Sequence, residues 1–383
     1  MFYVKKLISI GLLLAMLTIN AGAVADPPAV RAKSAALYDS GGNLLYEYNG
    51  EEQLPPASVT KIMTMLLVME AVDSGQVSFD DMVTGSAYAA SMGGTQIWLK
   101  EGEQLSLRDM LKAIAVASAN DCAVAVAEFL AGSEDAFVQK MNQRAKELGM
   151  KNTTFVNANG LDREGTQTIT SAKDIGIMSA ELLKHPTIKE FTTIWMDTIR
   201  NGEFTLANTN KMLKKYQGLN GLKTGFTTEA MYCISATAEK EGSEFIAVLM
   251  GEPTKEERNE DVAALLNYAF ANYQTITPDS SQQIPPVPVT MGTESVVYGN
   301  MEKAGKITIP KEQAETVTES LELEESVDAP VVPGQRLGSY VLRSGDTVLA
   351  EIPIVAAQGV ERIDFLGIYK HLLQGLFSEA NES

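Results

Sequence analysis

The sequence predicts an α+β protein: an antiparallel sheet with helices around it, then a small C-terminal all-β domain and an amphipathic C-terminal helix. Three observations lead to this prediction. Strand-like runs stand near the N-terminus and again after residue 200, a block of apolar helical segments separates them, and helical periodicity stops at Pro278. Strands that open and close a block of helices favour one antiparallel sheet covered by those helices.

The first strands form a hairpin. Ser34–Tyr38 and Leu44–Tyr48 flank a turn that contains two glycines and an asparagine, residues that suit a tight reversal of the chain. Three later runs combine β-branched, aromatic and apolar residues between turns. These predicted strands are Glu203–Asn208, Met231–Glu239 and Glu244–Met250.

The helical block begins with a long apolar helix. It is expected to start near Ser58, after Pro55 and Pro56, and to stop at Gly75. Five further segments have the three- and four-residue spacing of apolar side chains that is typical of helices. They are Leu107–Ala117, Asp121–Leu130, Glu134–Leu148, Ala172–Leu183 and Glu256–Tyr273.

Four segments are expected along the chain. Residues 1–25 read as a secretory signal peptide, because Lys5 and Lys6 precede an apolar run and small residues follow it. An uncleaved anchor is the alternative, and either reading places the working part outside the cytoplasm. Residues 26–277 form the main domain, residues 278–360 the β-rich domain, and residues 361–383 an amphipathic membrane-surface helix and tail.

The β-rich domain follows a proline-rich linker, Gln282–Pro288. Its expected strands are Ser295–Tyr298, Lys306–Ile309, Ser339–Leu342 and Thr347–Val355. An acidic stretch from Glu312 to Asp328 is interpreted as a solvated loop or an exposed strand face. The apolar stripe of Arg362–Phe377 could lie in a membrane interface or pack on the β domain, and the pattern favours neither.

Charge and cysteine content narrow the function. The formal net charge of −18 argues against nucleic acid or an anionic surface as a partner bound through bulk charge. An anionic substrate must therefore be met by local cations. Cys122 and Cys233 are the only cysteines, so no disulfide framework holds the protein; a single bridge is possible, and two small buried thiols are favoured.

Histidine is nearly absent, which excludes several kinds of active site. His185 precedes a proline at a predicted helix end and His371 lies in the tail, so a Ser-His-Asp mechanism is implausible. The sequence contains no zinc-ligand spacing and no phosphate-binding loop, and no cofactor is expected. A nucleophilic site must use another base.

Ser58 and Lys61 supply a nucleophile and a base. Three residues apart, they share one helix face and can come within hydrogen-bonding reach, and the lysine can accept the hydroxyl proton if it is neutral. Burial, the positive helix end and a second cation would each lower the pKa of the lysine. An unbroken apolar run follows Lys61, so this lysine lies on a buried helix rather than on a polar surface.

Two further triplets each occur once. Ser118-Ala119-Asn120 joins two predicted helices, where its hydroxyl and amide could face a cleft or simply cap a helix. Lys223-Thr224-Gly225 is expected to open an edge strand beside the cleft, with a glycine that lets a substrate backbone approach; an ordinary turn is the alternative. Together with Ser58 and Lys61, these triplets form the motif set of penicillin-binding proteins and class A β-lactamases.

Over essentially the whole mature chain, the sequence resembles the low-molecular-mass D-alanyl-D-alanine carboxypeptidases of the penicillin-binding protein superfamily. Its signature-like stretches are Leu54–Thr64, Ser118–Asp121, Gly149–Thr153 and Gly221–Thr227. The resemblance implies a β-lactamase/transpeptidase-like main domain, a β-rich second domain and a terminal helix at the membrane surface. The family often has a histidine before the Ser171-Ala172 pair, and this chain has none there.

The resemblance also implies roles for individual residues. Ser58 would attack the carbonyl between the terminal D-alanines of a peptidoglycan stem peptide, Lys61 would take the proton, and β-lactams would acylate Ser58. Ser118 and Asn120 would relay the proton and hold the peptide. Lys223 and Thr224, beside Gly225, would bind the terminal carboxylate, and Arg258 would be a second carboxylate contact. The amides of Ser58 and Phe226 would form the oxyanion hole.

Two other functions share parts of this pattern. A serine β-lactamase needs a dedicated glutamate to activate water, and no Glu-x-x-Leu-Asn stretch stands between the second and third motifs. A non-catalytic penicillin sensor would keep the pocket without turnover, and the intact Lys61, Asn120 and Lys223 speak against it.

Overall fold

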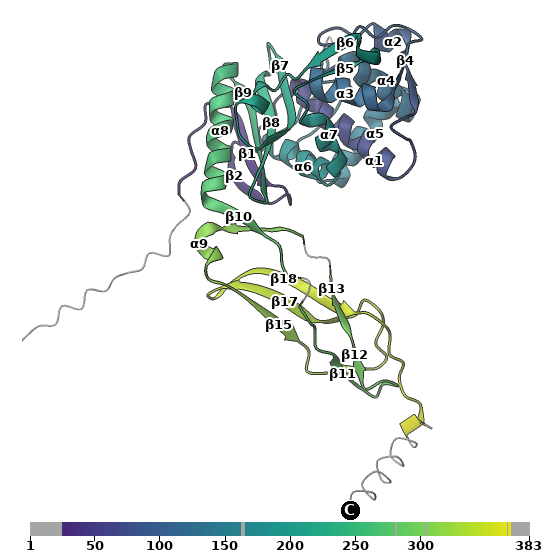
Figure 1. Ribbon diagram of the computed structural model, residues 1–383, viewed down its shortest axis with the longest axis vertical. Coiled ribbons are helices and arrows are strands. Elements are labelled where there is room, and N and C mark those ends of the chain that lie inside the picture. The colour runs from purple at the N-terminus through teal and green to yellow at the C-terminus, as the bar shows by residue number, and fades with distance from the viewer. Residues whose placement is uncertain (1–24, 162–164, 280–281, 303–304, 366, 369–383) are drawn as a thin grey trace, which may run out of the picture.

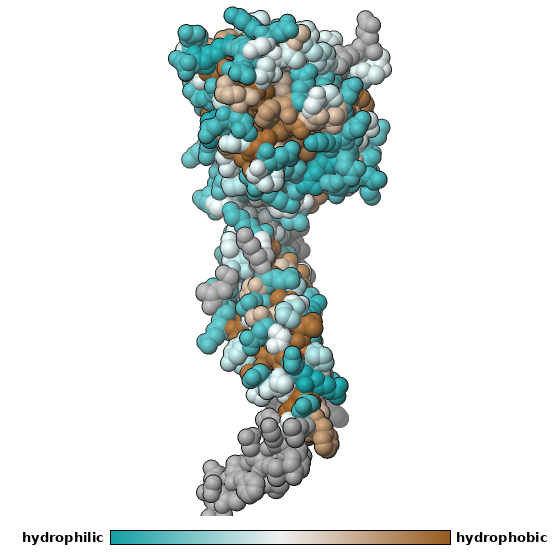
Figure 2. Space-filling model, turned by 90° about the vertical axis from the view of Figure 1, so that its right-hand side faces the viewer, coloured by the Kyte–Doolittle hydropathy of each residue, from teal (hydrophilic) through white to brown (hydrophobic). Residues whose placement is uncertain are grey.

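The computed structural model describes residues 25–161, 165–279, 282–302, 305–365 and 367–368. Figure 1 shows two parts along the long axis, an upper part of helices around a sheet and a lower part built of strands. In Figure 2 the lower part is the narrower of the two. The predicted signal segment lies outside the described residues except for Ala25, and most of the predicted C-terminal helix also lies outside them.

The upper part is built on a five-stranded antiparallel sheet in the order β2-β1-β9-β8-β7. The predicted hairpin is confirmed, because β1 and β2 pair with Ala35 opposite Tyr48. The last two strands of the sequence prediction correspond to β8 and β9. The bounds are β1 Ser34–Asp39, β2 Leu44–Tyr48, β7 Leu219–Thr227, β8 Met231–Lys240 and β9 Ser243–Glu252.

The two faces of this sheet pack against different helices. Because side chains alternate along a strand, Ala35 and Leu37 of β1 point to one face and Ala36 and Tyr38 to the other. The first face packs on α8, Lys255–Asn272, through residues such as Leu265. The second face packs on the helical block, where α6 contacts β1 and β9. The predicted antiparallel sheet with helices around it is confirmed.

The helical block lies between β2 and β7 in the chain, and its main helices stand within a few residues of their predicted positions. These are α1 Lys61–Asp73, α3 Leu107–Ala117, α4 Asn120–Ala131, α5 Glu134–Glu147 and α6 Ala172–Leu183. Shorter helices are α2 Ala87–Ala90, α7 Lys189–Thr192, η2 Pro186–Ile188, η3 Arg200–Gly202 and η4 Lys211–Lys214. Two antiparallel strand pairs complete the block: β3 Met82–Thr84 with β4 Gln104–Ser106, and β5 Met196–Ile199 with β6 Phe204–Ala207.

The long apolar helix begins differently from the prediction. Ala57–Thr60 form a separate 3₁₀ turn, η1, and the α-helix starts only at Lys61. The turn follows Pro56, and Ala57 has a φ of +48°, a conformation that an α-helix does not allow. As expected from the apolar run, α1 is buried on most sides, including Lys61.

The lower part has its own apolar core around Leu337, Tyr340 and Ile354. Its sheets are β13-β18-β17-β15 and β12-β11-β16, and β14 pairs with β10, the strand that continues α8. The strands and one short helix are β10 Tyr273–Ile276, β11 Val287–Thr290, β12 Val296–Val297, β13 Gly299–Met301, β14 Ile307–Pro310, α9 Lys311–Ala314, β15 Val317–Leu323, β16 Val327–Asp328, β17 Arg336–Ser344 and β18 Thr347–Ala356.

The predicted linker Gln282–Pro288 is too long, because β11 begins at Val287. Val287 and Val289 point into the core while Pro288 points outward, a strand alternation that the surrounding prolines hid from the sequence pattern. The acidic stretch behaves as expected, since Glu319 and Glu322 of β15 are both exposed.

Cys122 and Cys233 are both free and buried, as favoured from the sequence. Burial raises the pKa of the Cys233 thiol to about 11, so it stays protonated. Of the helices in the described ranges, none combines the length and the apolar character needed to cross a membrane.

Candidate active site

Ser58 and Lys61 meet at the junction of η1 and α1. Lys61 Nζ lies 3.0 Å from Ser58 Oγ. The serine is half-buried, whereas the lysine side chain is completely buried. The predicted contact between the two is confirmed, and the amine has no access to bulk water.

Lys61 has two other hydrogen-bond partners. Its Nζ donates to Asn120 Oδ1 at 2.6 Å and to the main-chain oxygen of Asn159 at 2.7 Å. Both atoms accept only, because Asn120 Nδ2 donates to Gly93 O at 2.8 Å and so fixes the orientation of its amide. A neutral amine has two N–H bonds and one lone pair. With both N–H groups taken by these acceptors, the lone pair is left for the hydroxyl proton of Ser58.

Two physical causes favour the neutral amine. Burial is the larger: it lowers the pKa of Lys61 well below the usual value of a lysine, since a charge is poorly solvated there. The positive charge of Lys223 lowers this pKa further, and Asp121 opposes the shift. The amine of Lys61 therefore loses its proton at a lower pH than that of an exposed lysine.

Ser118 follows the last residue of α3, and Asn120 is the first residue of α4. Ser118 ends α3 in the left-handed conformation, with φ +63° and ψ +33°. The capping alternative is wrong, because Ala119 occupies the N-cap position of α4 and no side chain caps that end. The buried Ser118 hydroxyl has no hydrogen-bond partner among the described residues. An unpaired buried hydroxyl costs about 1–3 kcal/mol, which a ligand bound in the cleft would recover.

Asp121 holds the neighbouring loop against this motif. Its carboxylate accepts hydrogen bonds from the amides of Ile97 and Leu99, at 3.0 and 2.9 Å. The amide of Asn120 donates to Thr95 O at 2.7 Å. These bonds fix both the Ser-Ala-Asn motif and the segment that faces it.

Lys223, Thr224 and Gly225 lie within β7, which is an edge strand as predicted. They do not open the strand, since β7 already begins at Leu219. The Lys223 side chain is buried and its Nζ donates to Thr224 O at 2.8 Å. Burial, with a smaller effect of Arg258, lowers the pKa of Lys223 to about 7.

Gly225 has a different role from the one expected. A Cβ atom on this residue would lie 2.5 Å from Pro56 O and 3.1 Å from Val59 N. The absent side chain therefore makes room for η1, which carries Ser58, and not for a substrate backbone. Gly225 allows the close approach of β7 to the turn that contains Ser58.

A pocket of about 370 Å³ joins the three motifs. Six predicted site residues line it or its mouth: Ser58, Ser118, Thr224, Gly225, Phe226 and Arg258. Lys61, Asn120 and Lys223 do not line the pocket themselves. Lys61 contacts Ser58 and Asn120, and Lys223 contacts the main chain of Thr224. Larger cavities occur elsewhere, one of about 550 Å³ beside Lys240 and Lys311, but they contain no motif residue.

Arg258 is a buried cation in the first turn of α8. Its guanidinium donates to Asn259 Oδ1 at 2.9 Å, and in the described part of the chain no carboxylate forms an ion pair with it. Burial lowers its pKa to about 10. With Lys223, it places cationic side chains at this pocket in a protein of net charge −18.

The sequence prediction missed several residues of the site. Thr95, Thr209, Tyr232 and Lys255 also line the pocket. The turn at Asn157–Gly160 supplies the second acceptor for Lys61, with Asn157 Oδ1 accepting from the amide of Gly160 at 2.6 Å. Its asparagines and glycine signal a turn, but not its position beside Lys61. Among the described residues, no three metal-binding side chains gather closely enough to hold an ion.

Comparison with known families agrees with this geometry. Residues 21–254 match the model of the D-alanyl-D-alanine carboxypeptidase family. The chain belongs to the D-alanyl-D-alanine carboxypeptidase family. It is a hydrolase of that type, and residues 273–362 match the C-terminal domain of penicillin-binding protein 5.

Individual relatives extend over nearly the whole chain. The D-alanyl-D-alanine carboxypeptidase DacF of Bacillus subtilis is 43% identical over 348 residues, covering 89% of each chain. Among solved structures, penicillin-binding protein 5 of Haemophilus influenzae has a TM-score of 0.78 and 29% identity, covering 88% of this chain and all of its own. Penicillin-binding protein D2 of Listeria monocytogenes with bound ampicillin is 36% identical over 64% of this chain and all of its own, with a TM-score of 0.56.

The role of Gly225 in this carboxypeptidase can be tested by adding one methyl group. We expect Gly225→Ala to push β7 away from η1, to lower the free energy of unfolding by about 1–3 kcal/mol and to slow acylation by penicillin. Chemical denaturation and the rate of penicillin labelling measure the two effects. Gly305→Ala is the matched control, because a Cβ atom there meets no atom within 4 Å. Equal behaviour of the two variants would contradict this role.

Proposed function

We propose that Ser58 is the nucleophile of a serine D-alanyl-D-alanine carboxypeptidase that removes the terminal D-alanine from peptidoglycan stem peptides. The observation that carries this proposal is the hydrogen-bonding set of Lys61, whose two acceptors leave its lone pair for the hydroxyl at 3.0 Å. In the reaction, Ser58 Oγ attacks the carbonyl carbon between the D-alanines as its proton passes to Lys61 Nζ. The peptide C–N bond then breaks, the leaving amine takes the proton, and water hydrolyses the resulting ester.

Ser118 and Asn120 assist this transfer. The Ser118 hydroxyl, unpaired within the described structure and open to the pocket, relays the proton to the departing amine. The Asn120 amide, held by Gly93, orients Lys61 and contacts the substrate peptide. The main-chain amides of Ser58 and Phe226 stabilise the developing oxyanion.

The terminal carboxylate binds at the cationic residues of the pocket. Thr224 of β7 and Arg258 of α8 both line it, and Lys223 precedes Thr224 in β7. Charge-assisted hydrogen bonds to a carboxylate are about twice as strong as neutral ones, and Arg258 has no counter-ion among the described residues. This arrangement accounts for a preference for peptides with a free C-terminus.

The segment boundaries and location of the protein are part of the same proposal. The family acts on the cell wall, and we place this protein at the outer face of the cytoplasmic membrane or in the wall. The pattern of residues 1–25 supports export. Residues 26–277 would carry the activity and residues 278–360 the β-rich domain, while the helix of residues 361–383 would touch the membrane surface.

The nucleophile is tested by substitution. Ser58→Ala is expected to abolish D-alanine release from a peptide ending in D-Ala-D-Ala and also to abolish the penicilloyl adduct, because both need Oγ. An assay of released D-alanine measures the first effect, and the intact mass of the protein measures the second. Ser91→Ala, an exposed serine outside the pocket, serves as the control. Penicillin labelling retained in Ser58→Ala would disprove the assignment, and no D-alanine release by the wild-type protein would favour a sensor. Turnover of benzylpenicillin within minutes would instead indicate a β-lactamase.

The carboxylate contact is tested with two substrates. We expect Arg258→Gln to raise the KM for a peptide with a free C-terminal carboxylate by about tenfold to a hundredfold, the cost of one charge-assisted hydrogen bond. The same peptide with a C-terminal amide should respond little, because it lacks the charge. Steady-state kinetics on both peptides provides the comparison. Equal losses on the two would remove Arg258 from carboxylate recognition.

A further inference from the structure

A second pocket lies next to the proposed active site and contains none of its residues. It has a volume of about 630 Å³, within the range of small-molecule sites. Its walls come from the loop before α3 and from the β5–β6 hairpin with η3. Its lining includes Trp98, Glu103, Gln104, Arg200, Asn201 and Phe204.

Trp98 is an unusually exposed aromatic residue. Its exposed fraction is 66%, although the residues on both sides, Ile97 and Leu99, are buried and held by Asp121. Packing in the protein core therefore does not explain this indole. Its ring meets the edge of Phe204, with centroids 5.9 Å apart and planes at 66°, so most of its surface faces the second pocket and solvent.

Arg200 connects the two walls of the second pocket. Arg200 donates to Ile97 O at 2.9 Å and to Glu103 Oε1 at 2.7 Å, and lies over the Phe204 ring. Three residues of the lining have left-handed backbone conformations without being glycine: Trp98, Arg200 and Asn201, with φ of +55°, +54° and +55°. Such conformations cost free energy and cluster at functional sites.

The second pocket is close enough to the first to bind another part of the same substrate. Thr95 lines the proposed active site and Trp98 lines the second pocket, and three residues span at most roughly 10 Å. A second link runs along β6 and the two residues after it, from Phe204 of the second pocket to Thr209 of the first, and five residues span at most roughly 18 Å. A stem peptide with four residues before its scissile bond spans roughly 13 Å when extended, and its far end is attached to the sugar chain of the polymer.

We propose that the second pocket binds an amino-sugar ring of the peptidoglycan chain to which the stem peptide is attached. A pyranose ring presents an apolar C–H face that stacks on an aromatic ring, and its rim of hydroxyl and acetamido groups hydrogen-bonds to amides and carboxylates. Trp98 supplies the aromatic face, and Asn201 and Gln104, both exposed, supply amide groups. This inference rests on the proposed carboxypeptidase function and adds a second contact with the same substrate. The contact makes the enzyme prefer substrates that carry the sugar to free peptides.

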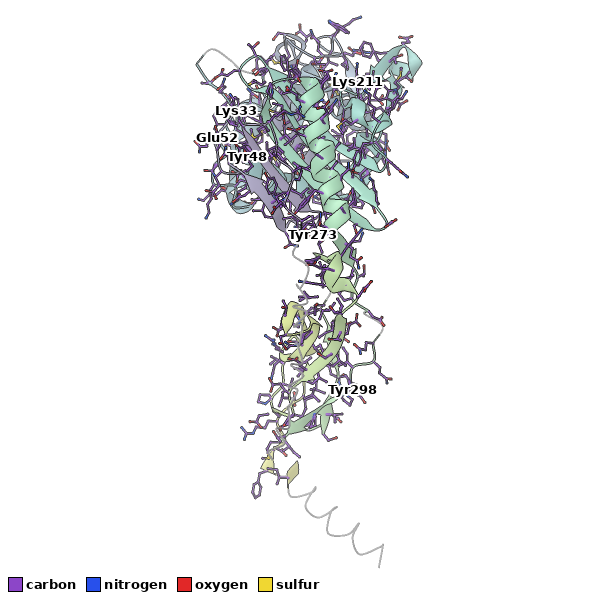
Figure 3. The ribbon with its side chains drawn as sticks, turned by 90° about the vertical axis from the view of Figure 1, so that its left-hand side faces the viewer. Lys33, Tyr48, Glu52, Lys211, Tyr273 and Tyr298 are labelled. Atoms are coloured by element: carbon purple, nitrogen blue, oxygen red, sulfur yellow. The ribbon has the colours of Figure 1, made fainter. Side chains whose placement is uncertain are left out.

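Two substrates with the same peptide test this. For a disaccharide-linked pentapeptide, Trp98→Ala is expected to raise the KM by about fivefold to tenfold with kcat unchanged, the effect of one lost aromatic contact. For the free pentapeptide, kcat/KM should stay within about twofold of wild type, because Trp98 does not line the pocket of Ser58. Trp98→Phe should restore most of the difference. Tyr48→Ala is the matched control, since this exposed aromatic residue lies on β2 at the opposite edge of the sheet from β7 (Figure 3).

Each outcome decides the point. Equal losses on both substrates would show that Trp98 only supports the loop held by Asp121, and no loss on either would show that no sugar binds there. Both overturn the inference while leaving the proposed function intact. Failure of the wild-type protein to release D-alanine from either substrate overturns the proposed function instead. If Trp98→Ala does not fold, the wild-type protein is titrated with the peptide-free disaccharide while tryptophan fluorescence is measured. An emission that does not change would contradict the inference.

Discussion

A lysine amine buried among acceptors is the constraint on which the rest of this structure depends. Lys61 has no access to solvent, and this burial lowers its pKa because it disfavours the charged form. Asn120 Oδ1 and Asn159 O occupy both hydrogens of the neutral amine. In the proposed mechanism the remaining lone pair accepts the proton of Ser58, so that the hydroxyl becomes a nucleophile without histidine.

Several elements far apart in the chain serve this one arrangement. Asn120 and Asn159 are 59 and 98 residues from Lys61 in sequence. The turn at Asn157–Gly160 presents the second acceptor, and Gly160 fits only without a side chain, because a Cβ atom would lie 1.9 Å from Ala57 O. Gly225 brings β7 close to η1 in the same way. These close approaches keep water away from the amine and hold the nucleophile beside the cationic end of the pocket.

The sequence predicted the elements of the fold well, because their signals are local. Apolar periodicity located α3 and α6 at their observed bounds, and alternation with turn residues located the β1–β2 hairpin. The sequence prediction failed where prolines or glycines interrupted the pattern or where the element was short. Prolines hid the start of β11, and the glycines of β7 concealed a strand that begins before Lys223.

The motif residues were also predictable, but their partners were not. Ser58, Lys61 and the two triplets are recognisable by spacing, whereas Thr95, Thr209 and Asn159 join the site only through tertiary packing. The reason for a glycine at position 225 likewise depends on which backbone lies opposite it. The spacing of residues along the chain identifies groups that act together within one element. Contacts between different elements can be known only from the folded structure.

Direct titration of Lys61 tests the central claim. In protein labelled with ¹³C at the lysine ε-carbons, the Lys61 signal is identified by its loss in Lys61→Arg, and its shift is followed with pH. Because the folded-state pKa is lowered, the amine should lose its proton well below the range near 10.4 in which exposed lysines titrate, and the rate of penicillin acylation should rise through the same pH interval. A Lys61 signal that titrates together with the exposed lysines would contradict a neutral base beside Ser58.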